Sequence, residues 1–152
     1  MKKRGLGIVS LIAIGAVLVL SGCGSSGGGK ALTKKEFAAK ANALCVSFNK
    51  ANAAVGNPSS LAETISYFEK LTPLYQKRVD GLAKLKPPAS EAASVKQIVA
   101  IERNEASVAT QLLAALKKND MTTANNLVKK GNANSTKAKG IYNTLGLTEC
   151  GK

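Results

Sequence analysis

Between residues 33 and 146, apolar side chains recur at steps of three and four residues, a pattern typical of amphipathic helices. The first helix is predicted to begin at Thr33, because Thr33 and Glu36 have the spacing of a capping box. It is expected to stop at Gly56-Asn57-Pro58. Its apolar stripe consists of Phe37, Ala41, Leu44, Cys45, Phe48 and Val55.

A second capping box, Ser60 with Glu63, predicts a helix that ends at Lys86-Pro87-Pro88. Pro73 lies inside this pattern, so the sequence predicts a kink near Leu71 or a break into two pieces. The apolar face of this helix consists of Leu61, Ile65, Phe68, Tyr75, Val79, Leu82 and Leu85.

A third helix is expected from the proline pair to about Lys118, since proline is well placed at the start of a helix. A fourth would follow the Asn119-Asp120 turn and end at Gly146. Gly131, in its middle, costs about 1 kcal/mol relative to alanine and predicts either fraying or close packing. The apolar positions of these two helices are Val95, Ile98, Val99, Ala106, Ala109, Leu112, Leu113 and Leu116, then Ala124, Leu127, Val128, Ala138, Ile141, Tyr142 and Leu145.

No segment alternates with period two for long enough to predict a strand. The sequence therefore predicts an all-α fold, an antiparallel four-helix bundle over residues 33–152. Histidine is absent from the 152 residues, which excludes Ser-His-Asp and Cys-His nucleophiles and histidine metal ligands.

The first 22 residues have a different character. Met1-Lys2-Lys3-Arg4 is a charged start, and the apolar run that follows is nearly long enough to span a bilayer. Leu20-Ser21-Gly22-Cys23 resembles a bacterial lipobox. That resemblance implies a lipoprotein signal peptide over residues 1–22, cleaved before Cys23, whose thiol carries diacylglycerol. An uncleaved anchor and an ordinary secretory signal are the alternatives.

Residues 23–32 are then the lipidated cysteine and a Gly/Ser tether with few side chains able to pack. Two acyl chains suffice for stable attachment, so we expect an extracytoplasmic domain on the outer leaflet of the cell membrane. Assigning Cys23 to lipid leaves Cys45 and Cys150, and in an exported domain a disulfide is the natural use of such a pair. It would close a loop of roughly a hundred residues, worth about 4–5 kcal/mol in the chain-entropy model.

Three short motifs carry a further resemblance. They are Asn42-Ala43-Leu44-Cys45, Leu82-Ala83-Lys84-Leu85-Lys86-Pro87-Pro88 and Leu145-Gly146-Leu147-Thr148-Glu149-Cys150-Gly151. With them the chain resembles a family of small, secreted or lipid-anchored helical proteins of actinobacterial type. The resemblance covers most of the processed domain and supports the bundle and the disulfide, and it implies no activity.

Candidate chemistry is sparse. Glu102 and Glu105 are the closest carboxylate pair, but ferritin-like metal sites need histidine beside glutamate, and Arg103 indicates a solvated charged face. Nor do the nine acidic residues suggest the two carboxylates of a glycosidase cleft. We therefore expect no catalytic site, metal or cofactor. Tyr67 and Tyr142 need partners for their hydroxyls, and a groove with both at its mouth would suit a small apolar ligand.

The charge balance is strongly basic, at +13 for the chain and +10 once the three basic residues of the signal peptide are removed. Six lysines with a single acid among them are candidates for anion binding: Lys117, Lys118, Lys129, Lys130, Lys137 and Lys139. They could meet lipid headgroups or wall polyanions such as teichoic acids, or serve only to keep the surface soluble. Nucleic acid is disfavoured by the compartment and by the scarcity of arginine.

The function expected from the sequence is therefore binding without catalysis. The partner would be an anionic envelope polymer, lipid headgroups or an envelope protein. The alternative is a carrier or sensor of a small apolar ligand held between helices.

Overall fold

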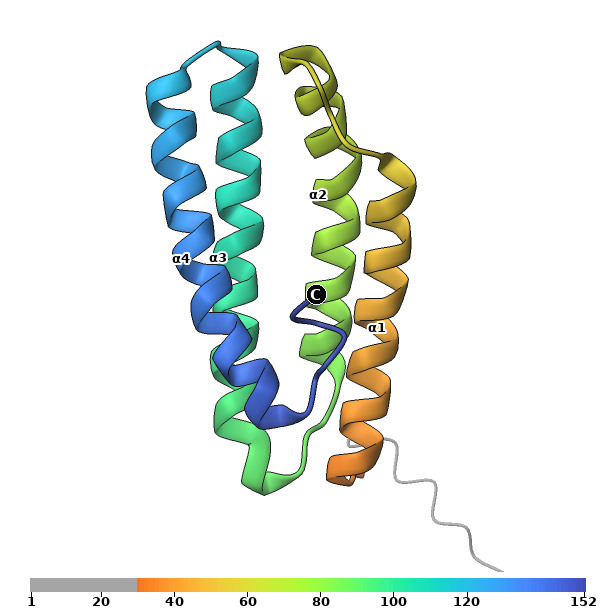
Figure 1. Ribbon diagram of the computed structural model, residues 1–152. Helices are drawn as coiled ribbons and strands as arrows, with labels where there is room; N and C mark the ends of the chain where they lie inside the picture. Colours follow the sequence, from red (N-terminus) through yellow and green to blue (C-terminus); the bar gives the residue numbers. More distant parts are fainter. Residues whose placement is uncertain (1–29) are drawn as a thin grey trace, which may run out of the picture.

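A computed structural model describes residues 30–152; the expected signal peptide, Cys23 and most of the tether lie outside these residues. The described chain forms four α-helices and no strand (Figure 1). They are α1 (Lys34–Val55), α2 (Leu61–Lys84), α3 (Ala92–Lys117) and α4 (Met121–Leu145), with a 3-10 turn, η1 (Ala89–Glu91), before α3. The all-helical prediction is confirmed.

The helix ends follow the capping signals. Thr33 accepts from the amide of Glu36, and the Glu36 carboxylate accepts from the amide of Thr33, so the first capping box is complete. Ser60 caps α2 through the amide of Glu63, whereas the Glu63 carboxylate turns to Ser59. Gly146 ends α4 with a left-handed φ of 70°, a conformation that glycine adopts without steric cost.

Pro73 does not break α2, which runs without interruption from Leu61 to Lys84. Of the two outcomes predicted at Pro73, a kink or a break, the break does not occur. A proline removes one backbone hydrogen bond, and α2 packs along both α1 and α3, so tertiary packing holds the two halves together.

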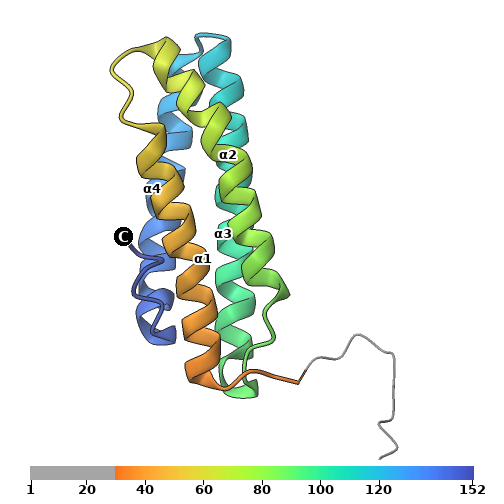
Figure 2. The same cartoon turned by 90° about the vertical axis from the view of Figure 1, so that its right-hand side faces the viewer.

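The four helices lie side by side, and consecutive helices run in opposite directions (Figures 1 and 2). Helix α2 packs on α1 and α3, and α4 packs on α3. The tail after α4, residues 146–152, crosses from α4 to α1 (Figure 1).

The tail is fastened to one face of α1. The sulfur atoms of Cys45 and Cys150 lie 1.93 Å apart, which confirms the predicted pairing. Asn42, about one turn before Cys45, donates to the carbonyl of Gly146 and accepts from the amide of Glu149. Asn49, about one turn after Cys45, donates to the carbonyl of Glu149 at 2.8 Å. Consequently α1 and the end of the chain form one covalently closed unit.

Two apolar clusters fill the interior. The first lies at the α1 N-terminal end and includes Phe37, Leu82, Ile98, Leu145 and Leu147. The second lies at the opposite end, where Val108, Leu112, Leu116, Ala124 and Leu127 pack with Ile65 and Phe68. The helical segments between the two clusters contribute a layer of charged and polar side chains, and this layer forms the candidate site.

Candidate functional site

An ion pair is buried at the centre of this layer. Nη2 of Arg78 on α2 lies 2.5 Å from Oε2 of Glu102 on α3, and the two residues are only 8% and 2% exposed. The prediction of a solvated face at Glu102 is therefore wrong. Glu102 lies four residues after Ile98 and four before Ala106, both buried, so it shares their face of α3, while Arg103 beside it is exposed.

Two aromatic rings lie against the Arg78 guanidinium. Its central carbon lies 4.5 Å from the ring centre of Phe48 on α1 and 4.4 Å from that of Tyr75 on α2. Rings at such distances attract a cation through their quadrupole, and arginine stacks on them better than lysine does. Burial, followed by the negative charge of Glu102, raises the pKa of Tyr75, so its hydroxyl stays protonated. The Arg78 side chain thus contacts residues of α1 and α3 as well as Tyr75 of its own helix, α2.

Glu105 lies about one turn beyond Glu102 and is half-buried. Its Oε2 is buried and has no hydrogen-bond partner among the described residues. Burial raises the pKa of Glu105, and the neighbouring charge of Glu102 adds to the effect; a hydrogen bond from Asn134 and the charge of Arg78 oppose it. Glu105 is thus the one carboxylate of the layer that Arg78 does not neutralise by direct contact.

Gly131 of α4 makes the room for Glu105. A Cβ atom at position 131 would lie 3.0 Å from Oε1 of Glu105, closer than carbon and oxygen normally approach. Of the two outcomes expected at this glycine, the structure shows close packing, because Gly131 is buried inside an unbroken helix.

The two tyrosines singled out from the sequence lie at different places. Tyr67 donates to Oδ1 of Asn52 at 2.7 Å, so its hydroxyl is satisfied within the chain. Tyr142 is 4% exposed, and its hydroxyl has no partner among the described residues. The expected groove with both tyrosines at its mouth is absent from the described part of the chain, and only Tyr142 belongs to the central layer.

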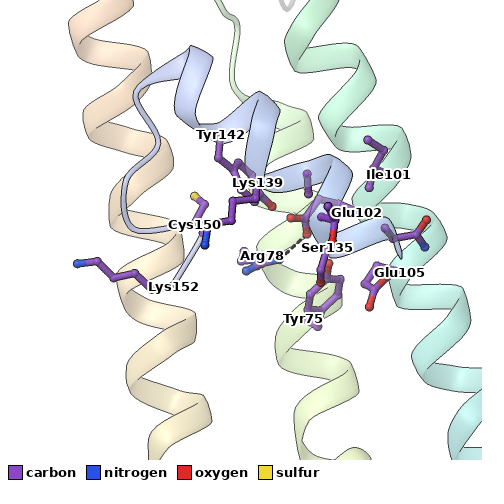
Figure 3. Close-up of a pocket in the computed structure, with 14 residues that line it drawn as sticks. Tyr75, Arg78, Ile101, Glu102, Glu105, Ser135, Lys139, Tyr142, Cys150 and Lys152 are labelled. Atoms are coloured by element: carbon purple, nitrogen blue, oxygen red, sulfur yellow. Dashed lines mark hydrogen bonds and ion pairs between the residues drawn. The ribbon is translucent and has the colours of Figure 1, made fainter. Parts of the chain in front are cut away.

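These residues line one pocket of about 310 Å³ between α2, α3, α4 and the tail (Figure 3). Tyr75, Arg78, Glu102, Glu105 and Tyr142 contribute to its wall. Lys139 and Ser135 of α4 are exposed residues of the same lining, and Gly151 and Lys152 contribute from the tail. The Lys152 ammonium is paired with Glu149 at 2.7 Å. The wall is charged inside and basic at its outer edge.

All six lysines predicted to bind anions are exposed. Lys117 pairs with Glu69 at 2.6 Å. Lys130 and Lys137 are seven residues apart, about two turns, and share a flank of α4. Lys139 lies about two and a half turns from Lys130 and so projects from the opposite side, next to the pocket. The six lysines therefore do not gather on a single face.

Within residues 30–152, no three potential ligands among Cys, Asp and Glu come together in a way that could hold a metal ion. None of the four helices in this range is long and apolar enough to cross a membrane. Comparisons with protein-family models, with curated proteins and with solved structures found no match to this chain.

Sequence reasoning missed Arg78 as a site residue. Arg78 lies three residues after Tyr75 and four before Leu82, so a charge interrupts the apolar face of α2. That interruption is the signal that could have identified it, since a buried charge needs a partner in a neighbouring helix.

Proposed function

We propose that this chain is a lipid-anchored, extracytoplasmic protein that acts by binding a small polar ligand in the pocket beside the Arg78–Glu102 pair. One observation carries the proposal. Three pocket residues on three helices, Arg78, Glu105 and Tyr142, each keep a buried polar atom without a partner among the described residues. Buried polar groups in folded proteins are nearly always hydrogen-bonded, so this cluster is suited to a partner from outside the chain.

The unpartnered polar atoms of the pocket wall indicate which kind of ligand would bind there. An apolar molecule would bury Glu105 Oε2 and the Tyr142 hydroxyl more deeply without bonding to either of them, which costs free energy. A ligand with hydrogen-bonding groups supplies the missing partners. The wall therefore favours a polar ligand over the small apolar ligand that the sequence offered as the alternative function.

Native mass spectrometry of the processed protein, purified from its own host in mild detergent, tests this function. Ser135→Trp places a large ring in the pocket, and Ser107→Trp is the matched control at an exposed site on α3 outside its lining. We expect an added mass on the wild type and on Ser107→Trp that is missing from Ser135→Trp. Repeated spectra without added mass, or equal loading of both variants, would contradict ligand binding in this pocket.

Membrane attachment rests on the lipobox Leu20-Ser21-Gly22-Cys23 and on the Gly/Ser segment behind it. We expect Cys23→Ala to move the protein from the membrane fraction to the soluble fraction, because both acyl chains are lost. A processed Cys23→Ala chain that stays with the membranes would contradict lipid anchoring.

A second candidate function is binding of an anionic envelope polymer or of lipid headgroups. It is favoured by Lys129, Lys130 and Lys137, which are exposed on α4 and form no ion pair with a described residue. Co-sedimentation with anionic vesicles and with purified cell wall would show binding that weakens as salt rises. Lys130→Gln/Lys137→Gln should reduce that binding more than the control Lys40→Gln/Lys50→Gln on α1; equal effects would leave these lysines as solubilising residues.

A further inference from the structure

The charges of the central layer do not balance. Arg78 contributes one positive charge, and Glu102 and Glu105 contribute two negative charges when both are ionised. The Arg78 guanidinium forms its ion pair with Glu102 and contacts the rings of Phe48 and Tyr75. It forms no ion pair with Glu105. A buried charge without a partner is costly, and the layer is one positive charge short.

The additional positive charge would be best placed next to the Glu105 carboxylate. Its Oε2 is buried, lacks a partner and lines the pocket, while its polar neighbour on α4, Asn134, is an uncharged amide. Burial, with a smaller contribution from the charge of Glu102, raises the pKa of Glu105, so that in the absence of a ligand the carboxyl group takes up a proton more readily. A ligand cation that reached this carboxylate would replace the proton.

The outer part of the pocket has the opposite sign. Lys139 is exposed, lines the pocket and forms no ion pair with a described residue, whereas Lys152 is already paired with Glu149. A molecule that entered past Lys139 toward Glu105 would meet a positive charge first and a negative charge deeper in. At about 310 Å³ the pocket lies at the lower end of the size range of ligand sites, which suits a molecule of amino-acid size.

We propose that this pocket binds a small molecule that carries a protonated amine, with the ammonium group against the Glu105 carboxylate and an anionic group, where present, near Lys139. The proposal rests on the ligand-binding function proposed above and specifies its chemistry. The ammonium neutralises the excess charge of the layer, and the Tyr142 hydroxyl is a further hydrogen-bonding group in the same wall.

Three straight-chain probes separate the contributions in calorimetric titrations of the full processed protein. 4-Aminobutanoate carries both charges, 1,4-diaminobutane carries only amines, and pentanoate carries only the carboxylate. We expect both amines to bind and pentanoate not to bind. Glu105→Gln should weaken both amines at least tenfold, while Lys139→Gln should weaken only 4-aminobutanoate. Glu69→Gln, at an exposed carboxylate outside the pocket, is the matched control and should change neither.

Several results would overturn the proposal: no binding of either amine at millimolar concentration, pentanoate binding as tightly as 4-aminobutanoate, or unchanged amine affinity in Glu105→Gln. Its failure can be told apart from failure of the proposed function. If the mass carried from the host is lost in Ser135→Trp and kept in Glu105→Gln, the pocket binds a ligand whose recognition does not depend on this carboxylate. If both variants keep that mass, neither proposal stands.

Discussion

At the scale of single residues, the centre of this protein depends on one arginine. The Arg78 guanidinium is removed from water, which is unfavourable, and the Glu102 carboxylate together with two aromatic rings offsets that cost. Lysine could not replace it, because the ammonium group lacks the flat guanidinium that contacts both the Phe48 and the Tyr75 rings. Each charge of the Arg78–Glu102 pair is thus stable in the interior only while the other is present.

We predict that Glu102→Gln lowers the free energy of unfolding by about 3–5 kcal/mol, since the buried guanidinium loses its counter-charge. Urea unfolding monitored by circular dichroism measures this. The double variant Arg78→Met/Glu102→Met should lose much less than the sum of the single losses, because no charge is left buried. Additive losses would show that the two charges do not depend on each other.

Glu105 makes stability depend on pH in a definite direction. Its pKa is raised in the folded state, so its contribution to stability is fully present below its ordinary value of 4.5 and is lost as pH rises through the folded-state pKa. The groups around it are Arg78 and Tyr75 on α2, Glu102 on α3, and Asn134, Lys139 and Tyr142 on α4.

We therefore expect Glu105→Gln to be more stable than the wild type at neutral pH, with the difference shrinking as pH falls toward 4.5. Thermal unfolding of both proteins across this pH range checks the expectation. A difference that stayed constant with pH would mean that Glu105 does not titrate in this window.

At the scale of helices, local sequence determines where a helix begins, whereas contacts with other helices determine which residues its interior contains. The ends are set by neighbours in sequence: Thr33, Ser60 and Asp120 each accept from an amide three residues further along. The interior of α4 depends on contacts with another helix. Gly131 lowers the local stability of α4, but it leaves room for the Glu105 carboxylate of α3. At position 131 a residue of low helix propensity is present because a larger one would crowd the Glu105 carboxylate.

This compromise can be measured with two glycines of the same helix. Gly140→Ala meets no atom within 4 Å and should stabilise the protein by about 0.5–1 kcal/mol. Gly131→Ala should gain less, or lose stability, because its new methyl group would crowd Glu105 Oε1. In a Glu105→Ala background the two substitutions should have equal effects. A full gain from Gly131→Ala in the wild-type background would show that Glu105 moves aside freely.

At the scale of the whole molecule, the helices were predictable and the central layer was not. Capping boxes, prolines and apolar periodicity act within a few residues, so the four helices could be derived from the sequence alone. Arg78 and Glu102 are 24 residues apart and meet only because of how α2 and α3 align lengthwise. Such alignment depends on packing along the full helices, and for that reason Glu102 was expected at the surface and the pocket was not foreseen.

The disulfide joins the two ends of the described fold, because its cysteines are 105 residues apart. We predict that Cys45→Ala/Cys150→Ala lowers the free energy of unfolding by about 4–5 kcal/mol in the chain-entropy model. It should also weaken ligand binding, since the released tail carries Gly151 and Lys152 away from the pocket. Urea titration and calorimetry measure the two effects. Unchanged stability would mean that the hydrogen bonds of Asn42 and Asn49 hold the tail without the covalent link.

The same separation has a consequence for how the disulfide forms. If the chain is exported from its N-terminal end, as the lipobox implies, the Cys45 thiol reaches the oxidising side of the membrane 105 residues ahead of its partner. During that interval Cys23 is the one other cysteine that the chain offers to an oxidant. If Cys23 carries lipid, as proposed above, acylation does more than attach the protein: it removes the competing thiol, and Cys45 is left with a single correct partner.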